Sequence, residues 1–219
     1  MSFLIDVFWS FRSPYSYLIS SRLVEVEARY ALQFRVRPVL PIAVRIEGFF
    51  DQVNPLWPPY VFRDSLRLAE SMEIPFRWPR PDPIVQSRDE DTGRLKTAAE
   101  QPHIYRLTRL GQLASEDGLG VPFIAEVSRL IFGGTENWHE GDHLDQAARR
   151  AGCDLSALDE RAESESDRLD AAIEANQAAL EAAGHWGVPT MAYDGEAFFG
   201  QDRLDLLVWR LKQSGLKER

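Results

Sequence analysis

The chain has 219 residues, with 25 lysines and arginines against 34 aspartates and glutamates, which gives a net charge of −9. This acidic balance argues against a nucleic-acid-binding protein, because such proteins neutralise phosphates with a basic face. Hydrophobic residues make up 44% of the chain and aromatic residues 11%. This is enough for a large core, so intrinsic disorder is not expected. The length fits one large domain, or one domain that carries an insertion.

The single cysteine, Cys153, limits the chemistry that the chain can perform. One cysteine cannot form an internal disulfide, a paired-cysteine redox motif or a cysteine-rich zinc cluster. A reduced, intracellular setting is the natural interpretation. No run approaches the roughly 18 apolar residues of a membrane span, and Asp6 interrupts the start where a signal peptide needs its apolar stretch. We therefore expect a soluble, cytoplasmic protein that binds neither nucleic acid nor a membrane.

The first sixty residues predict a strand, a helix, a second strand and a loop. Residues 3–9 are apolar at nearly every position, which is typical of a central strand covered on both faces. Pro14 suits the first position of a helix, which we expect to continue to about Tyr30. Alternating apolar and polar residues over 32–37 predict a half-buried strand. The proline- and aromatic-rich segment 38–59 predicts a loop that helps to form a site.

The middle of the chain has helical periodicity. Apolar residues at spacings of three and four predict helices over residues 62–72, 104–114 and 124–131. A proline-rich, charged connector over residues 79–102 separates the first two of these helices. From residue 154 to 184, nine acidic and two basic residues lie among many alanines. This composition predicts one long helix with an acidic exposed face.

The C-terminal segment returns to strands. Residues 185–193 are typical of an approach to a strand, and Asp194-Gly195 is a strong signal for a hairpin turn. Residues 196–199 are predicted to form the partner strand. An amphipathic helix with a buried leucine face follows, beginning near Leu204. The chain therefore ends as strand, strand, helix.

The complete element order is β-α-β, several helices, then β-β-α. With an X-Pro bond at the entry to the third strand, this is the arrangement of a thioredoxin-like fold with helices inserted in its middle. We therefore predict an α/β protein. A thioredoxin-like domain is expected over residues 1–58 and 185–219, and a long, all-helical insertion over residues 59–184.

Three short motifs, in this order and spacing, resemble those of a known family. Residues 13–18 (Ser-Pro-Tyr-Ser-Tyr-Leu) look like the active-site turn of the kappa-class glutathione transferases and the 2-hydroxychromene-2-carboxylate isomerases, within the DsbA-like thioredoxin-fold superfamily. Residues 187–190 (Gly-Val-Pro-Thr) and 198–204 (Phe-Phe-Gly-Gln-Asp-Arg-Leu) look like that family's other two signatures, and residues 63–66 match in the first inserted helix. The resemblance covers essentially the whole chain. It implies a homodimer that uses glutathione as its cofactor.

Two serines occupy the positions where related disulfide oxidoreductases have their cysteines, Ser13 first and Ser16 second. Disulfide exchange is therefore excluded. A hydroxyl just before a helix N-terminus lies in a field that favours negative charge. If glutathione lies there, Ser13 can donate a hydrogen bond to its sulfur and stabilise the thiolate. Ser13 is then the catalytic residue; the alternative is an ordinary helix N-cap, a role that serine often takes.

The resemblance assigns glutathione binding to Val188, Pro189, Gln201 and Asp202. It implies a cis bond at Pro189, which would let the backbone of Val188 pair with the cysteinyl part of glutathione. It places Gln201 and Asp202 at the γ-glutamyl end, where N–H groups that open a helix can hold a carboxylate and an aspartate can hold an ammonium. The alternatives are a plain strand-entry proline and an aspartate that complements the helix dipole.

The match departs from the family pattern at Gln201, which stands in place of the more usual serine, and at a lysine that this chain lacks. Members that use glutathione usually have a lysine shortly before the aspartate of the first inserted helix, but this chain has no lysine before Lys96, and Trp57 falls at about that position. Arg45 or Arg63 could take its place, although arginine and lysine are not interchangeable at such contacts. Asn54 is the candidate for the family's glutathione-contacting asparagine.

These features lead to the hypothesis of a glutathione-dependent isomerase that acts on an aromatic-derived unsaturated acid, such as a 2-hydroxychromene-2-carboxylate. The Ser13-stabilised thiolate would add reversibly to a conjugated carbon. Arg12 is the first candidate to hold the substrate carboxylate, and Trp57 to line an aromatic-substrate pocket. The alternatives are a kappa-like transferase that releases the conjugate and a non-catalytic binding protein. No metal is expected, since His139 and His143 are typical of a solvated surface.

Overall fold

A four-stranded mixed sheet lies at the centre of the computed structural model, which describes residues 3–219. Strand β1 (Phe3–Trp9) pairs in parallel with β2 (Leu32–Pro38) and antiparallel with β5 (Thr190–Tyr193). Strand β6 (Glu196–Phe199) pairs with β5, so the strand order is β2-β1-β5-β6. The sequence prediction of a central strand over residues 3–9 is confirmed.

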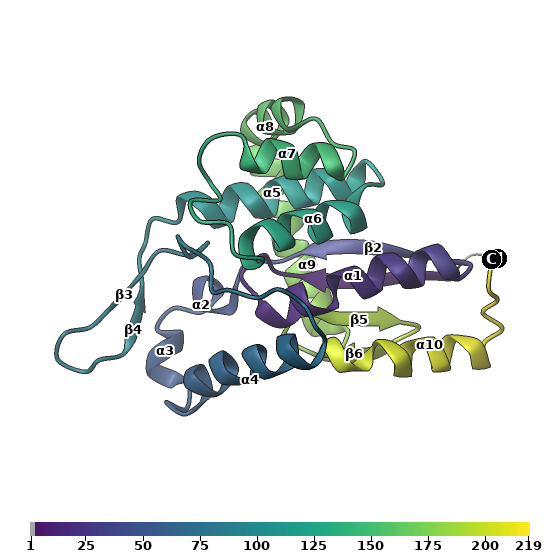
Figure 1. Cartoon of the computed structure of the whole chain (residues 1–219), viewed down its shortest axis with the longest axis horizontal. Coiled ribbons are helices and arrows are strands. Elements are labelled where there is room, and N and C mark those ends of the chain that lie inside the picture. The colour runs from purple at the N-terminus through teal and green to yellow at the C-terminus, as the bar shows by residue number, and fades with distance from the viewer. Residues whose placement is uncertain (1–2) are drawn as a thin grey trace.

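Helices cover both faces of this sheet. In Figure 1, α1 crosses in front of the sheet, α9 lies behind it, α5 to α8 gather above it and α4 lies below it. The helical elements are α1 (Pro14–Arg29), α2 (Ile42–Arg45), α3 (Phe49–Gln52), α4 (Trp57–Ser71), α5 (Pro102–Glu116), α6 (Gly120–Phe132), α7 (His143–Arg150), α8 (Leu155–Ser164), α9 (Ser166–Ala182), the 3₁₀ turn η1 (Gln201–Arg203) and α10 (Leu204–Gln213).

The central strand β1 is buried on both faces because its side chains point alternately into two layers. Ile5, Val7 and Trp9 belong to the main core, which continues into α1, α5 and α6. Phe8 faces the other way and packs near Leu180 of α9. All four β1 side chains are almost fully buried, so β1 is the strand to which both helical layers attach.

The inserted region is not entirely helical, which corrects the sequence prediction. The connector contains a hairpin formed by β3 (Gln86–Arg88) and β4 (Leu95–Thr97) that projects from the body in Figure 1. These three-residue strands are mostly polar, so they lack the apolar alternation that predicts a strand. The segment 38–59 likewise contains the short helices α2 and α3, and α4 already begins at Trp57.

The single long helix predicted over residues 154–184 is two helices, α8 and α9. Glu165 lies between them with a non-helical φ of −110° and ψ of 19°. Its carboxylate accepts hydrogen bonds from Arg161 at 3.4 Å and from Arg168 at 2.7 Å, one on each side of the break. Because neither glycine nor proline marks this break, the sequence pattern continues through it.

One hydrophobic core extends through both predicted domains. Its members include Ile5 and Val7 of the sheet together with Leu107, Phe123 and Phe132 of the inserted helices. The domain boundaries at residues 58 and 185 therefore remain a prediction from the sequence. Within residues 3–219, none of the helices has the length and apolar character needed to span a membrane.

A buried asparagine, Asn176 of α9, joins three elements through its side chain. Its Nδ2 donates hydrogen bonds to the Pro38 carbonyl at 3.0 Å and to Gln112 Oε1 at 2.8 Å. Its Oδ1 accepts a hydrogen bond from Arg37 Nε at 2.9 Å. Because buried polar groups are costly when they lose their partners, this amide stabilises the junction of β2, α5 and α9.

We predict that Asn176→Ala lowers the free energy of unfolding by about 2 kcal/mol, because it leaves several buried polar groups without partners. The thermal midpoint should fall by roughly 4 to 8 °C, as followed by circular dichroism. The control is Glu174→Ala, an exposed position on the same helix, which should change stability by less than about 0.5 kcal/mol. Equal losses in the two variants would contradict the role of Asn176.

Candidate functional site

The chain leaves β1 at Trp9 and turns directly into α1, with Ser13 as the N-cap residue. Ser13 has extended backbone angles of −84° and 117°, and its Oγ accepts a hydrogen bond from the Ser16 N–H at 3.2 Å. Pro14 takes the first helical position, where no N–H is needed. The half-buried Ser13 hydroxyl therefore lies at a helix N-terminus, where unpaired N–H groups favour negative charge.

The same hydroxyl reaches a second segment far along the chain. Ser13 Oγ donates a hydrogen bond to the Val188 carbonyl at 3.3 Å. Val188 lies just before β5, and its bond to Pro189 is cis. The Val188 N–H donates no hydrogen bond to any of residues 3–219. This unpaired N–H beside Ser13 is a donor that an extended ligand backbone can use.

A third segment joins through Gly200, whose N–H donates to the Pro189 carbonyl at 2.9 Å. This bond places η1 beside Pro189, and η1 also packs against α1. Gln201 is half-buried, whereas the Asp202 carboxylate is exposed and pairs with Arg203 at 2.6 Å. The structure therefore brings together the Ser13, Val188–Pro189 and 200–202 segments.

The second serine of the turn, Ser16, differs from Ser13 in its surroundings. Ser16 is fully buried, and its Oγ has no hydrogen-bond partner among the described residues. Only its backbone N–H takes part in the cap of α1. Of the two hydroxyls in the turn, the one on Ser13 is therefore the one that a ligand can reach.

Arg12, the predicted substrate-binding residue, is held by the connector that follows α4. Its Nε donates to Asp82 Oδ1 at 2.5 Å, and its guanidinium lies 5.1 Å from the centre of the Trp78 ring. The Asp82 carboxylate also accepts hydrogen bonds from the Ile84 N–H at 3.1 Å and from Gln86 Nε2 at 2.9 Å. Arg12 is thus fixed at Nε, and its Nη groups donate no hydrogen bond within residues 3–219.

Asn54 and Trp57, two other predicted binding residues, lie at the start of α4. The exposed Asn54 side chain accepts a hydrogen bond from the Leu56 N–H at 3.0 Å. The Trp57 ring is 39% exposed and meets the Phe49 ring edge-on, with centroids 5.7 Å apart. These interactions lie within residues 49–57. They are separate from the hydrogen bonds that join Ser13, Val188 and Gly200.

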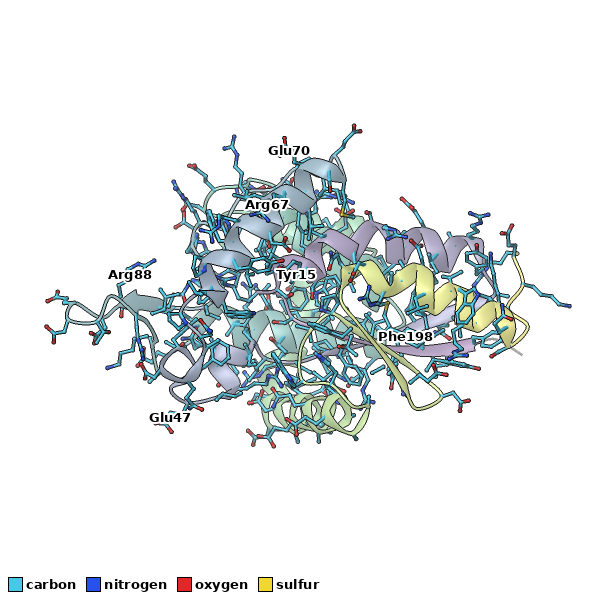
Figure 2. The ribbon with its side chains drawn as sticks, turned by 90° about the horizontal axis from the view of Figure 1, so that it is seen from below. Tyr15, Glu47, Arg67, Glu70, Arg88 and Phe198 are labelled. Atoms are coloured by element: carbon cyan, nitrogen blue, oxygen red, sulfur yellow. The ribbon has the colours of Figure 1, made fainter. Side chains whose placement is uncertain are left out.

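Tyr15 connects α1 to α4, a link that the sequence analysis did not identify. Its hydroxyl donates to Asp64 Oδ2 at 2.9 Å. Figure 2 shows Tyr15 near the middle of the molecule, with Arg67 and Glu70 farther along α4. Burial and the neighbouring Asp64 carboxylate raise the pKa of Tyr15, so it stays protonated and holds α4 beside the turn.

Arg45, at the end of α2, contacts the loop that leads to Val188. Its Nη2 donates to the Trp186 carbonyl at 2.9 Å, two residues before Val188. Its Nε is buried with no acceptor among the described residues, and burial lowers the pKa of Arg45. An aromatic stack lies next to this carbonyl, since the His185 ring lies 3.9 Å from that of Phe199 and 5.4 Å from that of Trp186.

No thiol lies at the turn. Cys153 is buried in the connection between α7 and α8, and burial, followed by the nearby Asp117, raises the pKa of its thiol. Such a thiol is a poor nucleophile. Within residues 3–219, no group of three or more histidine, cysteine, aspartate and glutamate side chains is arranged to hold a metal ion. The chemistry at the turn therefore depends on Ser13 and on whatever binds beside it.

Solved structures with the same architecture include enzymes of two kinds. A 2-hydroxychromene-2-carboxylate isomerase is 21% identical, with a TM-score of 0.64 over 96% of this chain and 95% of its own. The cytosolic disulfide reductase DsbM from Pseudomonas aeruginosa is 18% identical, with a TM-score of 0.58 over 96% of this chain and 99% of its own. DsbM has also been solved with glutathione. At these identities the likeness shows the fold alone.

No curated protein matches the chain. The model of the DSBA-like thioredoxin domain matches residues 4–212. This match includes the Ser13 turn, the inserted helices, the Val188–Pro189 bond and nearly all of α10. The protein therefore belongs to the DsbA-like thioredoxin domain family.

Proposed function

We propose that this protein is a glutathione-dependent isomerase of the 2-hydroxychromene-2-carboxylate type, acting on an aromatic-derived unsaturated acid. The observation that carries the proposal is the position of the Ser13 hydroxyl. It lies at the N-terminus of α1, next to the Val188 backbone, in a turn that contains no cysteine. The similar isomerase structure, which aligns along nearly the whole chain, supports the proposal.

Disulfide chemistry, which the name of the similar DsbM structure describes, does not fit this chain. Disulfide exchange needs a thiolate that attacks a disulfide sulfur. Ser13 and Ser16 occupy the turn, and the buried Cys153 lies in a different part of the fold. A serine hydroxyl can stabilise an anion beside a helix N-terminus, but it cannot take part in thiol–disulfide exchange.

The residues of the site fit the chemical groups of glutathione. The unpaired Val188 N–H can donate to a peptide backbone, and the Val188 carbonyl, which accepts from Ser13 Oγ, can accept a second hydrogen bond through its other lone pair. The exposed Asp202 carboxylate can hold an ammonium, and the N–H groups that open η1 can hold a carboxylate. When bound, glutathione would supply a thiolate that adds to a conjugated carbon, which turns the double bond into a single bond that can rotate; departure of the thiolate then restores the double bond and regenerates glutathione.

The chain's own residues would orient this chemistry. The Ser13 hydroxyl can rotate from the Val188 carbonyl to donate its proton to the bound sulfur, while its oxygen still accepts the hydrogen bond from Ser16. Asp82 fixes Arg12, whose Nη groups are then available for a substrate carboxylate. We assign Gln201 and Asn54 to glutathione binding and Trp57 to the aromatic part of the substrate. The proposal includes a homodimer, which the family resemblance implies, and a cytoplasmic location, which the single cysteine favours.

A kappa-like glutathione transferase would use the same binding residues and differ only in releasing the conjugate. Product analysis distinguishes the two, because an isomerase returns glutathione unchanged. A non-catalytic binding protein is the other alternative, and the tryptophan at the place of the family's lysine is its best support.

We predict that glutathione binds the wild type and that Asp202→Ala weakens binding about tenfold or more, through the loss of a charge-assisted contact. Isothermal titration calorimetry measures both constants. The matched control is Asp205→Ala, which removes an exposed carboxylate nearby that pairs with Arg22 instead. Absence of binding to the wild type at millimolar glutathione would contradict the proposed function.

We also predict that Ser13→Ala lowers the rate of glutathione-dependent isomerisation of 2-hydroxychromene-2-carboxylate by about 10- to 100-fold, because the hydrogen bond to the thiolate is lost. Ser16→Ala is the matched control, since it removes an unpartnered hydroxyl from the same turn. Its rate should remain within about twofold of the wild type. A Ser13→Ala enzyme of unchanged activity would rule out the proposed role of this residue.

The loss of activity in Ser13→Ala should not result from unfolding. Removing an N-cap costs about 1 kcal/mol, so the thermal midpoint should fall by roughly 2 to 4 °C. Differential scanning fluorimetry checks this. A fall of more than about 10 °C would mean that Ser13 is chiefly a structural residue and that the kinetic result must be interpreted through stability.

A further inference from the structure

The guanidinium of Arg45 is a half-buried charge without a counter-ion. No carboxylate lies within 4 Å of it in the part of the chain that the structure describes, and Glu181 attracts it only from farther away. Within residues 3–219, its one hydrogen bond goes from Nη2 to the Trp186 carbonyl, while Nε is buried and has no acceptor there. Elsewhere the buried or half-buried arginines have acidic partners, as Arg12 has Asp82 and Arg37 has Asp6.

A buried charge without a partner is unfavourable, because burial removes water and nothing replaces it. Such a group is a candidate for a binding site when it lies next to a functional turn, since a ligand of opposite charge supplies the missing partner. The Trp186 carbonyl that Arg45 contacts belongs to the same loop as Val188. Arg45 therefore lies at one end of the candidate site.

The opposite end of the site carries the opposite charge. Pro189 follows Val188, and its carbonyl binds the Gly200 N–H, which places the Asp202 turn next to it. Along the loop, the order is therefore Arg45 at Trp186, Ser13 at Val188 and Asp202 beyond Pro189. The Arg45 cation lies before the Ser13 position, and the Asp202 carboxylate lies after it; its Oδ2 pairs with Arg203, and its Oδ1 accepts no hydrogen bond within residues 3–219.

This polarity selects one direction for a bound peptide. Glutathione has an ammonium only on its γ-glutamyl residue, whereas its glycyl end has only a carboxylate. With the cysteinyl residue opposite Val188, the antiparallel direction puts the ammonium near Asp202 and the glycyl carboxylate near Trp186. The parallel direction would place the glycyl carboxylate beside Asp202, which is electrostatically unfavourable.

We infer that Arg45 binds the glycyl carboxylate of glutathione and so takes the place of the lysine that this chain lacks. The inference rests on the proposed function, because it assumes that glutathione binds beside Val188. Arg63, the other arginine that could substitute, is exposed on α4, where water already solvates its charge. The charge of Arg63 therefore needs no ligand as a partner, whereas the half-buried charge of Arg45 lacks one.

The test compares glutathione with its glycyl ethyl ester, in which the glycyl carboxylate is no longer charged. Both ligands are titrated calorimetrically into the wild type, Arg45→Gln and the matched control Arg63→Gln. The wild type and Arg63→Gln should bind glutathione about tenfold or more tightly than the ester. Arg45→Gln should bind the two ligands with affinities within about twofold, because the group that distinguishes them is gone.

Three outcomes would overturn the inference, and they differ from one another. If Arg45→Gln keeps the wild-type ratio of acid to ester affinities, Arg45 does not contact the glycyl carboxylate. If Arg45→Gln instead raises only the KM for the aromatic acid, Arg45 binds the substrate carboxylate. If the wild type binds neither ligand, the proposed function itself fails.

The design does not depend on one variant folding well. Should Arg45→Gln unfold, the wild type alone can still overturn the inference, since equal affinities for glutathione and the ester would mean that no cation holds the glycyl carboxylate. Arg45→Lys then serves as the second variant. It keeps the charge but loses the two-pronged geometry of the guanidinium, so the ratio of affinities should fall between those of the wild type and a neutral side chain.

Discussion

Strand β1 pairs antiparallel with β5, with Phe8 opposite Thr190. The C-terminal end of β1 and the N-terminal end of β5 therefore lie side by side at the same end of the sheet. At this end of the sheet, β1 leads into α1 through Ser13, and Val188 lies just before β5. The distance between these groups is therefore set by the pairing of an apolar strand. Individual hydrogen bonds contribute only about 1 kcal/mol each, so they orient the site while burial of β1 holds it in place.

The parts of the fold that local chemistry determines could be predicted from the sequence. The buried strand β1 follows from its apolar residues, and the start of α1 follows from Ser13 and Pro14. The turn between β5 and β6 follows from Asp194-Gly195, whose positive φ values of 49° and 78° suit these two residues. The break at Glu165 could not be predicted, because no helix-breaking residue marks it; the arginines on its two sides have partners far away in the sequence, Arg161 with Asp117 and Arg168 with Glu116.

The candidate site divides in the same way. The motifs around Ser13, Val188 and Asp202 were found from the sequence, and the structure joins those three segments through hydrogen bonds. The partners of Arg12 and Arg45 could not be predicted from the sequence. Asp82 lies 70 residues from Arg12 and the Trp186 carbonyl lies 141 residues from Arg45, so only the folded chain shows that one guanidinium has a carboxylate and the other does not.

This difference between the arginines bears on the lysine that this chain lacks where the glutathione-using family that it resembles usually has one. Any element that contacts the loop before Val188 can supply a cation for the carboxylate of a ligand. In this chain that element is α2, whose Arg45 donates to the Trp186 carbonyl. In the proposed arrangement, the free protein bears the desolvation of Arg45, and the glycyl carboxylate offsets it on binding. The position of Arg45 in the folded structure would then supply the positive charge, so that binding would not require a cation at the place of Trp57, where members of the resembled family usually have a lysine.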